Sequence, residues 1–225
     1  MLHVSYTLGD VADILAIDDE AVERYVDVLS AVSSSIENSN LERAVIELAP
    51  IADELWFGRF VRPARSPALD ANTEIAKRAV SHQDRVNVFR RDCFLCLYCG
   101  KRTIPRCVLV AISDVFQDAF AYHPNYKRGA LHPAFWLAPE ADHVVAHARG
   151  GSSDPSNLVT LHAMCNLLKS DSPADDLPII ERPDRMVEWD GLLSKYAAIV
   201  AHGGGSQRAE YHRFWMRLYG VKPVA

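Results

Sequence analysis

The sequence lacks an apolar segment that could cross a membrane. None of its uninterrupted apolar runs reaches the roughly 20 residues that a spanning helix needs. The segment MLHVSYTLGDVADIL has no basic region and carries Asp10 and Asp13, so its pattern does not indicate a secretory signal. We therefore expect a cytoplasmic protein that does not associate with membranes.

Positive charge is not in excess either. Lysine and arginine number 24 against 29 acidic residues, which gives a formal net charge of -5. Nucleic-acid-binding domains commonly carry a basic surface, so the overall composition disfavours that class. A metal-loaded site can be locally positive, however, and the net charge does not exclude a nuclease.

One segment departs from this acidic balance. Between residues 85 and 106, six basic side chains accompany a single acid, Asp92. The six are Arg85, Arg90, Arg91, Lys101, Arg102 and Arg106. The segment is either a solvated face or a surface that contacts phosphate groups. In the second case Arg90 and Arg91 are candidate substrate-binding residues.

The number and spacing of the cysteines do not favour disulfides. The chain has five, and a C-x-x-C spacing in a chain without a secretory signal is more typical of metal binding. Cys96 and Cys99 form one such pair, and His162 and Cys165 repeat its inner spacing. Together they predict a tetrahedral zinc site, which is structural because four protein ligands leave no open position.

An alternative first pair is Cys93 and Cys96. Gly100 directly after Cys99 suits the tight turn of a zinc knuckle, and Phe94-Leu95 offers no such turn residue, so the pair Cys96 and Cys99 is preferred. Cys93 and Cys107 are then spare thiols, which we expect to pack as small apolar side chains.

Apolar residues at helical spacing predict a mainly helical chain. The predicted helices lie within residues 1–62, 72–91, 108–123, 185–200 and 208–220. Ser39-x-x-Glu42 resembles a capping box, and Pro50 kinks or restarts the helix that follows it. Two prolines indicate a linker at 62–70, and residues 125–137 suggest a loop leading into a strand.

The segment TLGDVADILAIDDEAVERYV has the pattern of a helix-turn-helix. Its second helix, which would read DNA, begins with Asp18, Asp19 and Glu20, and these side chains would repel phosphate groups. A helical subdomain or a partner surface is therefore the preferred interpretation.

The residue types between 142 and 169 suit hydrolytic chemistry. Asp142 places an oxygen ligand beside His143, a titratable base, although on a strand adjacent side chains point to opposite faces. Asn166 adds a neutral oxygen, and such donors suit Mg²⁺ or a similar hard ion. Gly150-Gly151 predicts a turn, in which Asn157 can bind loop backbone.

The order of these residues resembles the HNH endonuclease family. The matching segments are VFRRDCFLCLYCG and ADHVVAHARGGSSDPSNLVTLHAMCNLLKSD, within residues 85–172. The resemblance implies an α+β fold, mainly helical, in which flanking N- and C-terminal helices surround a small zinc-braced ββα-metal core. The expected division is a helical N-terminal region at 1–70, a nuclease domain at 71–172 and a helical C-terminal region at 173–225.

The resemblance also implies roles for individual residues. His143 would be the general base in the hydrolysis of DNA phosphodiester bonds. Asp142 and Asn166 would be ligands of a catalytic Mg²⁺ or Mn²⁺ ion, and Asn157 would hold the loop and orient the base. Lys169 and Arg149 would contact phosphate. The structural Zn²⁺ would be bound by Cys96, Cys99, His162 and Cys165.

Three features depart from the family pattern. Asn166 stands where a histidine is common, His162 replaces a cysteine, and the spacing between Cys99 and Asp142 is long. The long spacing predicts an inserted helix at about 104–135 that covers or extends the DNA groove. A non-catalytic, zinc-stabilised nucleic-acid-binding module is the alternative function, and a protein partner or self-association through the flanking helices is left open.

Overall fold

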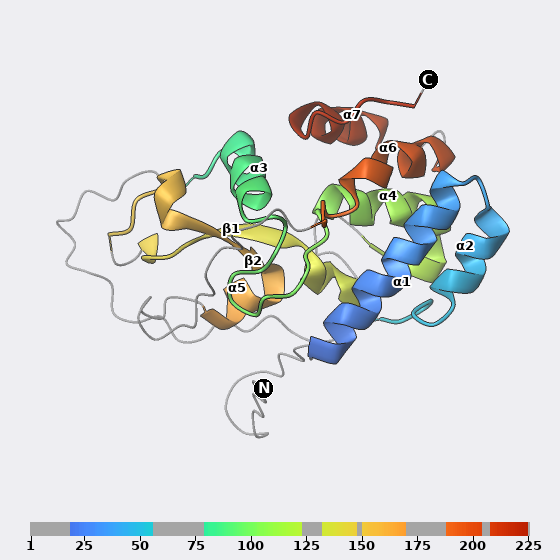
Figure 1. The fold of residues 1–225 in the computed structure, drawn as a ribbon, viewed down its shortest axis with the longest axis horizontal. Helices are drawn as coiled ribbons and strands as arrows, with labels where there is room; N and C mark the ends of the chain where they lie inside the picture. The colour runs from blue at the N-terminus through green and yellow to red at the C-terminus, as the bar shows by residue number, and fades with distance from the viewer. Residues whose placement is uncertain are drawn as a thin grey trace.

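The computed structural model describes residues 19–55, 79–122, 132–147, 150–169, 188–203 and 208–224. Within these ranges it confirms a mainly helical α+β fold with one two-stranded antiparallel sheet (Figure 1). The first helix of the helix-turn-helix pattern, the linker at 62–70 and Arg149 lie outside the described residues.

Seven α-helices and two strands make up the described chain, with short 3-10 turns between them. The helices are α1 (Asp19–Glu37), α2 (Leu41–Leu48), α3 (His82–Arg91), α4 (Arg106–Phe116), α5 (Ala163–Lys169), α6 (Leu193–His202) and α7 (Ala209–Leu218). The strands are β1 (Pro139–His143) and β2 (Leu158–His162), and the 3-10 turns are η1 (Gln117–Phe120), η2 (Pro133–Leu137) and η4 (Pro155–Asn157).

Helix α4 lies at the centre of a helical body. It contacts α6 and α7, and α6 in turn contacts α1 (Figure 1). Residues Cys107–Ser113 are all buried, which requires neighbours on every side of the helix. Most of α4 therefore belongs to the core, and the prediction that the insertion at 104–135 covers or extends a DNA groove stays a prediction.

The two strands form a hairpin between two helices. β1 pairs with β2 from Pro139↔His162 to His143↔Leu158. Helices α3 and α5 each contact both strands and lie on opposite sides of the hairpin (Figure 1). Buried residues of the hairpin and of the N- and C-terminal helices belong to one hydrophobic cluster. The predicted domain boundaries remain a prediction.

Several predicted element boundaries are wrong for local reasons. Asn40, not Ser39, caps α2 by accepting a hydrogen bond from the Arg43 backbone N–H at 3.0 Å. The predicted loop that leads into a strand is confirmed in its described part, since residues 133–137 form the 3-10 turn η2 and β1 begins at Pro139. Helix α6 begins at Leu193 instead of near 185, because Gly191 and Leu192 have φ values of 70° and 66°.

No helix among the described residues is both long and apolar enough to cross a membrane.

Candidate metal centre and active site

A tight turn carries the first two thiols of the predicted zinc site. An antiparallel bridge between Leu95 and Arg102 closes the turn, and Gly100 adopts a φ of 74°, which a side chain would disfavour. The Gly100 N–H donates to the Cys96 carbonyl at 2.8 Å. The Leu97 N–H donates to the Thr160 carbonyl at 2.8 Å, so the turn is tied to β2.

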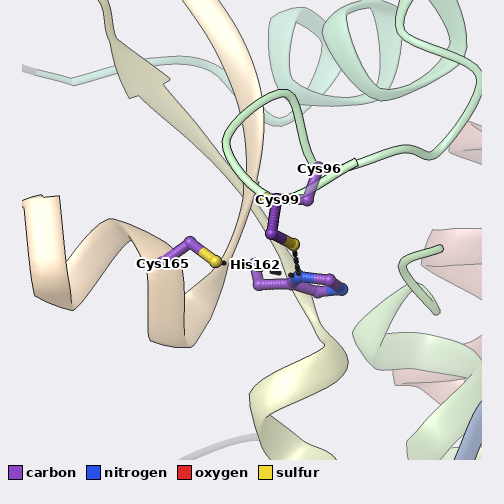
Figure 2. A group of neighbouring side chains, drawn as sticks. All are labelled: Cys96, Cys99, His162 and Cys165. Carbon is purple, nitrogen blue, oxygen red and sulfur yellow. Dashed lines mark hydrogen bonds between the residues drawn. The ribbon is translucent and has the colours of Figure 1, made fainter. Parts of the chain in front are cut away.

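The four predicted zinc ligands converge. One ligand atom from each of Cys96, Cys99, His162 and Cys165 lies within 4.8 Å of the others. Figure 2 shows Cys165 reaching from α5 toward the His162 ring, whose Nδ1 lies 3.3 Å from Cys99 Sγ and 3.9 Å from Cys165 Sγ. The other ring nitrogen, Nε2, lies 2.9 Å from the Arg102 carbonyl.

This donor set fits zinc. A histidine that donates one ring N–H to a carbonyl presents its other nitrogen as a metal ligand, and three thiolates complete a closed tetrahedral set. Burial opposes the charge on Cys96, yet hydrogen bonds from Cys165 and Cys99 lower its pKa well below the ordinary range. Burial likewise opposes a proton on His162, but the Cys96 charge raises the pKa of that ring well above its ordinary value. The cluster therefore stabilises a thiolate beside a protonated imidazole, and a bound zinc ion would take the place of that proton.

Asp142 and His143 are the last two residues of β1, and their environments differ. Asp142 Oδ2 lies 2.7 Å from Lys169 Nζ on α5. The same ammonium donates to the His143 carbonyl at 2.8 Å, and the Lys169 side chain is only 1% exposed. The structure thus places Lys169 inside the protein, not on the surface where a phosphate contact requires it.

The Asp142 side chain is not fully buried. Its Oδ2 is enclosed against the Lys169 ammonium, but the side chain as a whole is 16% exposed. Asn166 on α5 offers an amide oxygen on the same side of β1. Oxygen donors of this kind fit a hard divalent ion such as Mg²⁺ or Mn²⁺.

Glu140 is a charged residue that the sequence reasoning missed. Asn166 Nδ2 donates to Glu140 Oε2, and Arg106 lies 3.5 Å from Glu140 Oε1. The signal was present in the sequence, because residues 140 and 142 leave the same face of a strand. In the sequence Asp142 stands next to a possible base, His143, whereas Glu140 lies between Pro139 and Ala141.

Asn157 holds the loop that follows β1. Its Oδ1 accepts from the Val145 N–H at 2.9 Å, and its Nδ2 donates to the Val145 and Ser152 carbonyls at 3.2 and 2.8 Å. The predicted Gly-Gly turn lies beside it, with a φ of 86° at Gly150. A Cβ at Gly151 would lie 1.7 Å from the Val145 carbonyl oxygen, so this close approach requires glycine.

His143 faces this loop. Its Nε2 lies 3.1 Å from Ser153 Oγ, and its ring is edge-on to that of His147 at 6.0 Å between centroids. The sequence gave no reason to single out Ser153, because a serine in a polar loop is common. The loop therefore surrounds the predicted base with polar partners.

The arginines of the basic segment bind groups of the chain itself. Arg91 donates to the Pro155 and Leu158 carbonyls, both at 2.6 Å, and pairs with the buried Asp92. Arg90 donates to the Tyr219 carbonyl. The other internal contacts join Arg85 to the Val80 carbonyl, Arg102 to Glu23 and Asp27, and Arg106 to Glu140. Arg90 and Arg91 thus link α3 to the end of α7 and to β2, and because both residues are exposed, their contact with phosphate stays a prediction.

Residues 137–172 match the family model described as HNH endonuclease. The match covers β1, the loop, β2 and α5, and it confirms the resemblance found in the sequence. Neither the curated proteins nor the solved structures include a match to this chain.

Proposed function

We propose, from the HNH match over residues 137–172, that this protein is a metal-dependent endonuclease that hydrolyses phosphodiester bonds in DNA. The observation that carries the proposal is the placement of Asp142, His143 and Asn166 at the end of β1 and on α5, within the matched segment. A module that only binds nucleic acid has no chemical need of a base beside two oxygen donors.

His143 is the general base of the proposed reaction. If its Nε2–H donates to Ser153 Oγ, the lone pair lies on Nδ1, and that nitrogen takes the proton of the attacking water. Asn157 fixes the backbone at Val145, two residues after the base, and so limits the motion of the strand end. General-base catalysis of this kind accelerates hydrolysis by about 10²- to 10⁴-fold.

Asp142 and Asn166 would hold the divalent ion through their side-chain oxygens. A bound Mg²⁺ or Mn²⁺ supplies stabilisation of the negative charge on the phosphate and on the leaving oxygen. Lys169 anchors both neighbours on β1, since its ammonium contacts the Asp142 carboxylate and the His143 carbonyl. In this proposal Lys169 positions the site and does not bind DNA.

The zinc site would brace this arrangement. Cys165 and Asn166 are consecutive on α5, so a metal bound by Cys165 fixes the start of the helix that carries Asn166 and Lys169. Structural zinc sites contribute directly to folding. We therefore assign a structural role to Zn²⁺ and a catalytic role to the second, hard ion.

Supercoiled plasmid DNA incubated with zinc-loaded protein and Mg²⁺ or Mn²⁺ tests the proposal. We expect nicked or linear product from the wild type and a rate lower by about 10²- to 10⁴-fold for His143→Ala, with an unchanged melting temperature. His202→Ala, in the last turn of α6, is the matched control and should cut at the wild-type rate. An active His143→Ala protein would contradict the assignment of the base.

One observation favours the alternative of a non-catalytic, zinc-stabilised nucleic-acid-binding module. The Lys169 ammonium already balances the charge of Asp142, so the carboxylate does not depend on a metal ion for neutralisation. DNA or RNA binding with no cleavage under Mg²⁺, Mn²⁺ or Ca²⁺ would support this alternative. Cleavage of RNA but not DNA would keep the chemistry and change the substrate.

A further inference from the structure

Two polar contacts join β1 to α5. Glu140 and Asp142 are two positions apart on the strand and therefore leave the same face, while Asn166 and Lys169 are three positions apart on the helix and share its facing side. Asn166 contacts Glu140, and Lys169 contacts Asp142. Each acid thus has its own partner on α5.

The contact between Glu140 and Asn166 constrains which way the asparagine amide points. An ionised carboxylate can only accept hydrogen bonds, so Asn166 must turn its Nδ2 toward Glu140 and its Oδ1 away. A hard cation requires the opposite end of the amide, Oδ1, as its ligand. The hydrogen bond therefore leaves available the one atom that a divalent ion can use.

We propose that Glu140 is a positioning residue that orients the Asn166 amide so that its oxygen is presented to the divalent ion. The inference rests on the proposed function of Asp142 and Asn166 and adds a residue that acts through one of them. Partners of this kind around a metal site commonly change metal affinity by about 10- to 100-fold when they are lost.

Arg106 makes this role specific to a carboxylate. Its guanidinium lies 3.5 Å from Glu140 Oε1, while Oε2 accepts from Asn166. With both oxygens engaged by protein groups, Glu140 is suited to orienting a ligand rather than to being one. A glutamine at this position has a single oxygen, which Arg106 would attract, so its NH₂ group would face Asn166 and favour the wrong amide orientation.

The test compares Glu140→Gln in two backgrounds by direct Mn²⁺ titration of zinc-loaded protein without DNA, followed by electron paramagnetic resonance of the free ion. In the wild-type background we expect Mn²⁺ affinity to fall by about 10- to 100-fold. In the Asn166→Asp background we expect no loss, because the two oxygens of a carboxylate are equivalent and need no orientation. Removing the negative charge of Glu140 there also relieves repulsion.

A matched control separates this effect from stability. Glu54→Gln removes a carboxylate that pairs with Arg24 at 28% side-chain exposure, close to the 25% of Glu140, and it lies in the helical body. It should bind Mn²⁺ as the wild type does. Thermal unfolding of each variant, with zinc retained, shows whether the protein is folded during the titration.

Three results would overturn the inference. One is an equal loss of affinity in both backgrounds, which would make Glu140 a direct ligand. Another is unchanged affinity of Glu140→Gln in the wild-type background, and the third is an Asn166→Asp protein that binds no Mn²⁺. The proposed function can fail independently of this inference. If Glu140→Gln lowers Mn²⁺ affinity only when residue 166 is asparagine, but the protein cleaves no nucleic acid, the positioning role holds and the nuclease assignment is rejected.

Discussion

The two candidate metal sites share helix α5, but the groups that contact their candidate ligands differ in kind. Cys165 belongs to a closed set of three thiols and an imidazole, and these groups have mainly each other as polar partners. Asn166, the next residue, belongs to a face on which the chain supplies its own cations, Lys169 for Asp142 and Arg106 for Glu140.

This difference indicates which metal the fold depends on. Four polar donors, three of them buried, are costly to hold together without an ion, so the zinc site should be required for folding. Acids that are already balanced by a lysine and an arginine are stable without an ion. The hard metal would then be required for chemistry alone, and the fold would survive its removal.

The largest effect should follow from loss of one zinc ligand. Cys96→Ser removes the thiolate that the cluster stabilises most, and we expect loss of zinc and unfolding of the hairpin, since structural zinc contributes on the order of 10 kcal/mol in small domains. Zinc content per chain and thermal unfolding measure this. Cys93→Ser, outside the ligand set, should retain its zinc; a zinc-replete Cys96→Ser protein would show that the ligand set is wrong.

Loss of the internal cation should come next. Lys169→Met leaves the Asp142 carboxylate without its partner, and breaking a buried pair of this kind costs about 3 to 5 kcal/mol. Denaturant unfolding measures the loss, and added Mn²⁺ should recover part of it in the variant, because the ion takes over the charge balance. Lys195→Met, which breaks an exposed pair with Glu37, should cost at most about 1 kcal/mol. Equal stability of the two variants would contradict the comparison of the sites.

A smaller effect is expected where the site is held by hydrogen bonds alone. Asn157→Ala removes three side-chain contacts with the loop backbone, and we expect a loss of about 1 to 3 kcal/mol in unfolding free energy. Faster amide hydrogen exchange at Val145 would locate the change. Asn87→Ala on α3, where the side chain accepts a hydrogen bond from the exposed Gln83, should leave that exchange rate unaltered.

The smallest change is expected in DNA binding. Lys169→Met should leave the salt dependence of DNA binding unchanged. A lysine that contacts phosphate contributes about 0.9 to the slope of log K against log salt concentration. Because Lys169 is buried against Asp142, the slope should match that of the wild type at a temperature where both are folded. If the magnitude of the slope falls by about 0.9 in the variant, Lys169 contacts phosphate as the sequence predicted.

The sequence by itself determined the candidate chemistry, because ligand spacing is a local property. The paired spacings of Cys96-x-x-Cys99 and His162-x-x-Cys165, and the turn at Gly100, were sufficient to predict the convergence that the structure contains. The Gly150-Gly151 turn beside Asn157 followed from residue type in the same way.

Only the tertiary structure decided what the charged side chains do. The sequence does not show which group a charged side chain contacts. Lys169 pairs with Asp142 across 26 intervening residues, and Arg90 contacts Tyr219, which lies near the other end of the sequence. The packing of α5 on β1 turned a predicted phosphate ligand into an internal counter-ion and brought Glu140 to Asn166. Helix α4 is buried in part by α6 and α7, and the sequence around residue 106 does not show that these later helices pack against it.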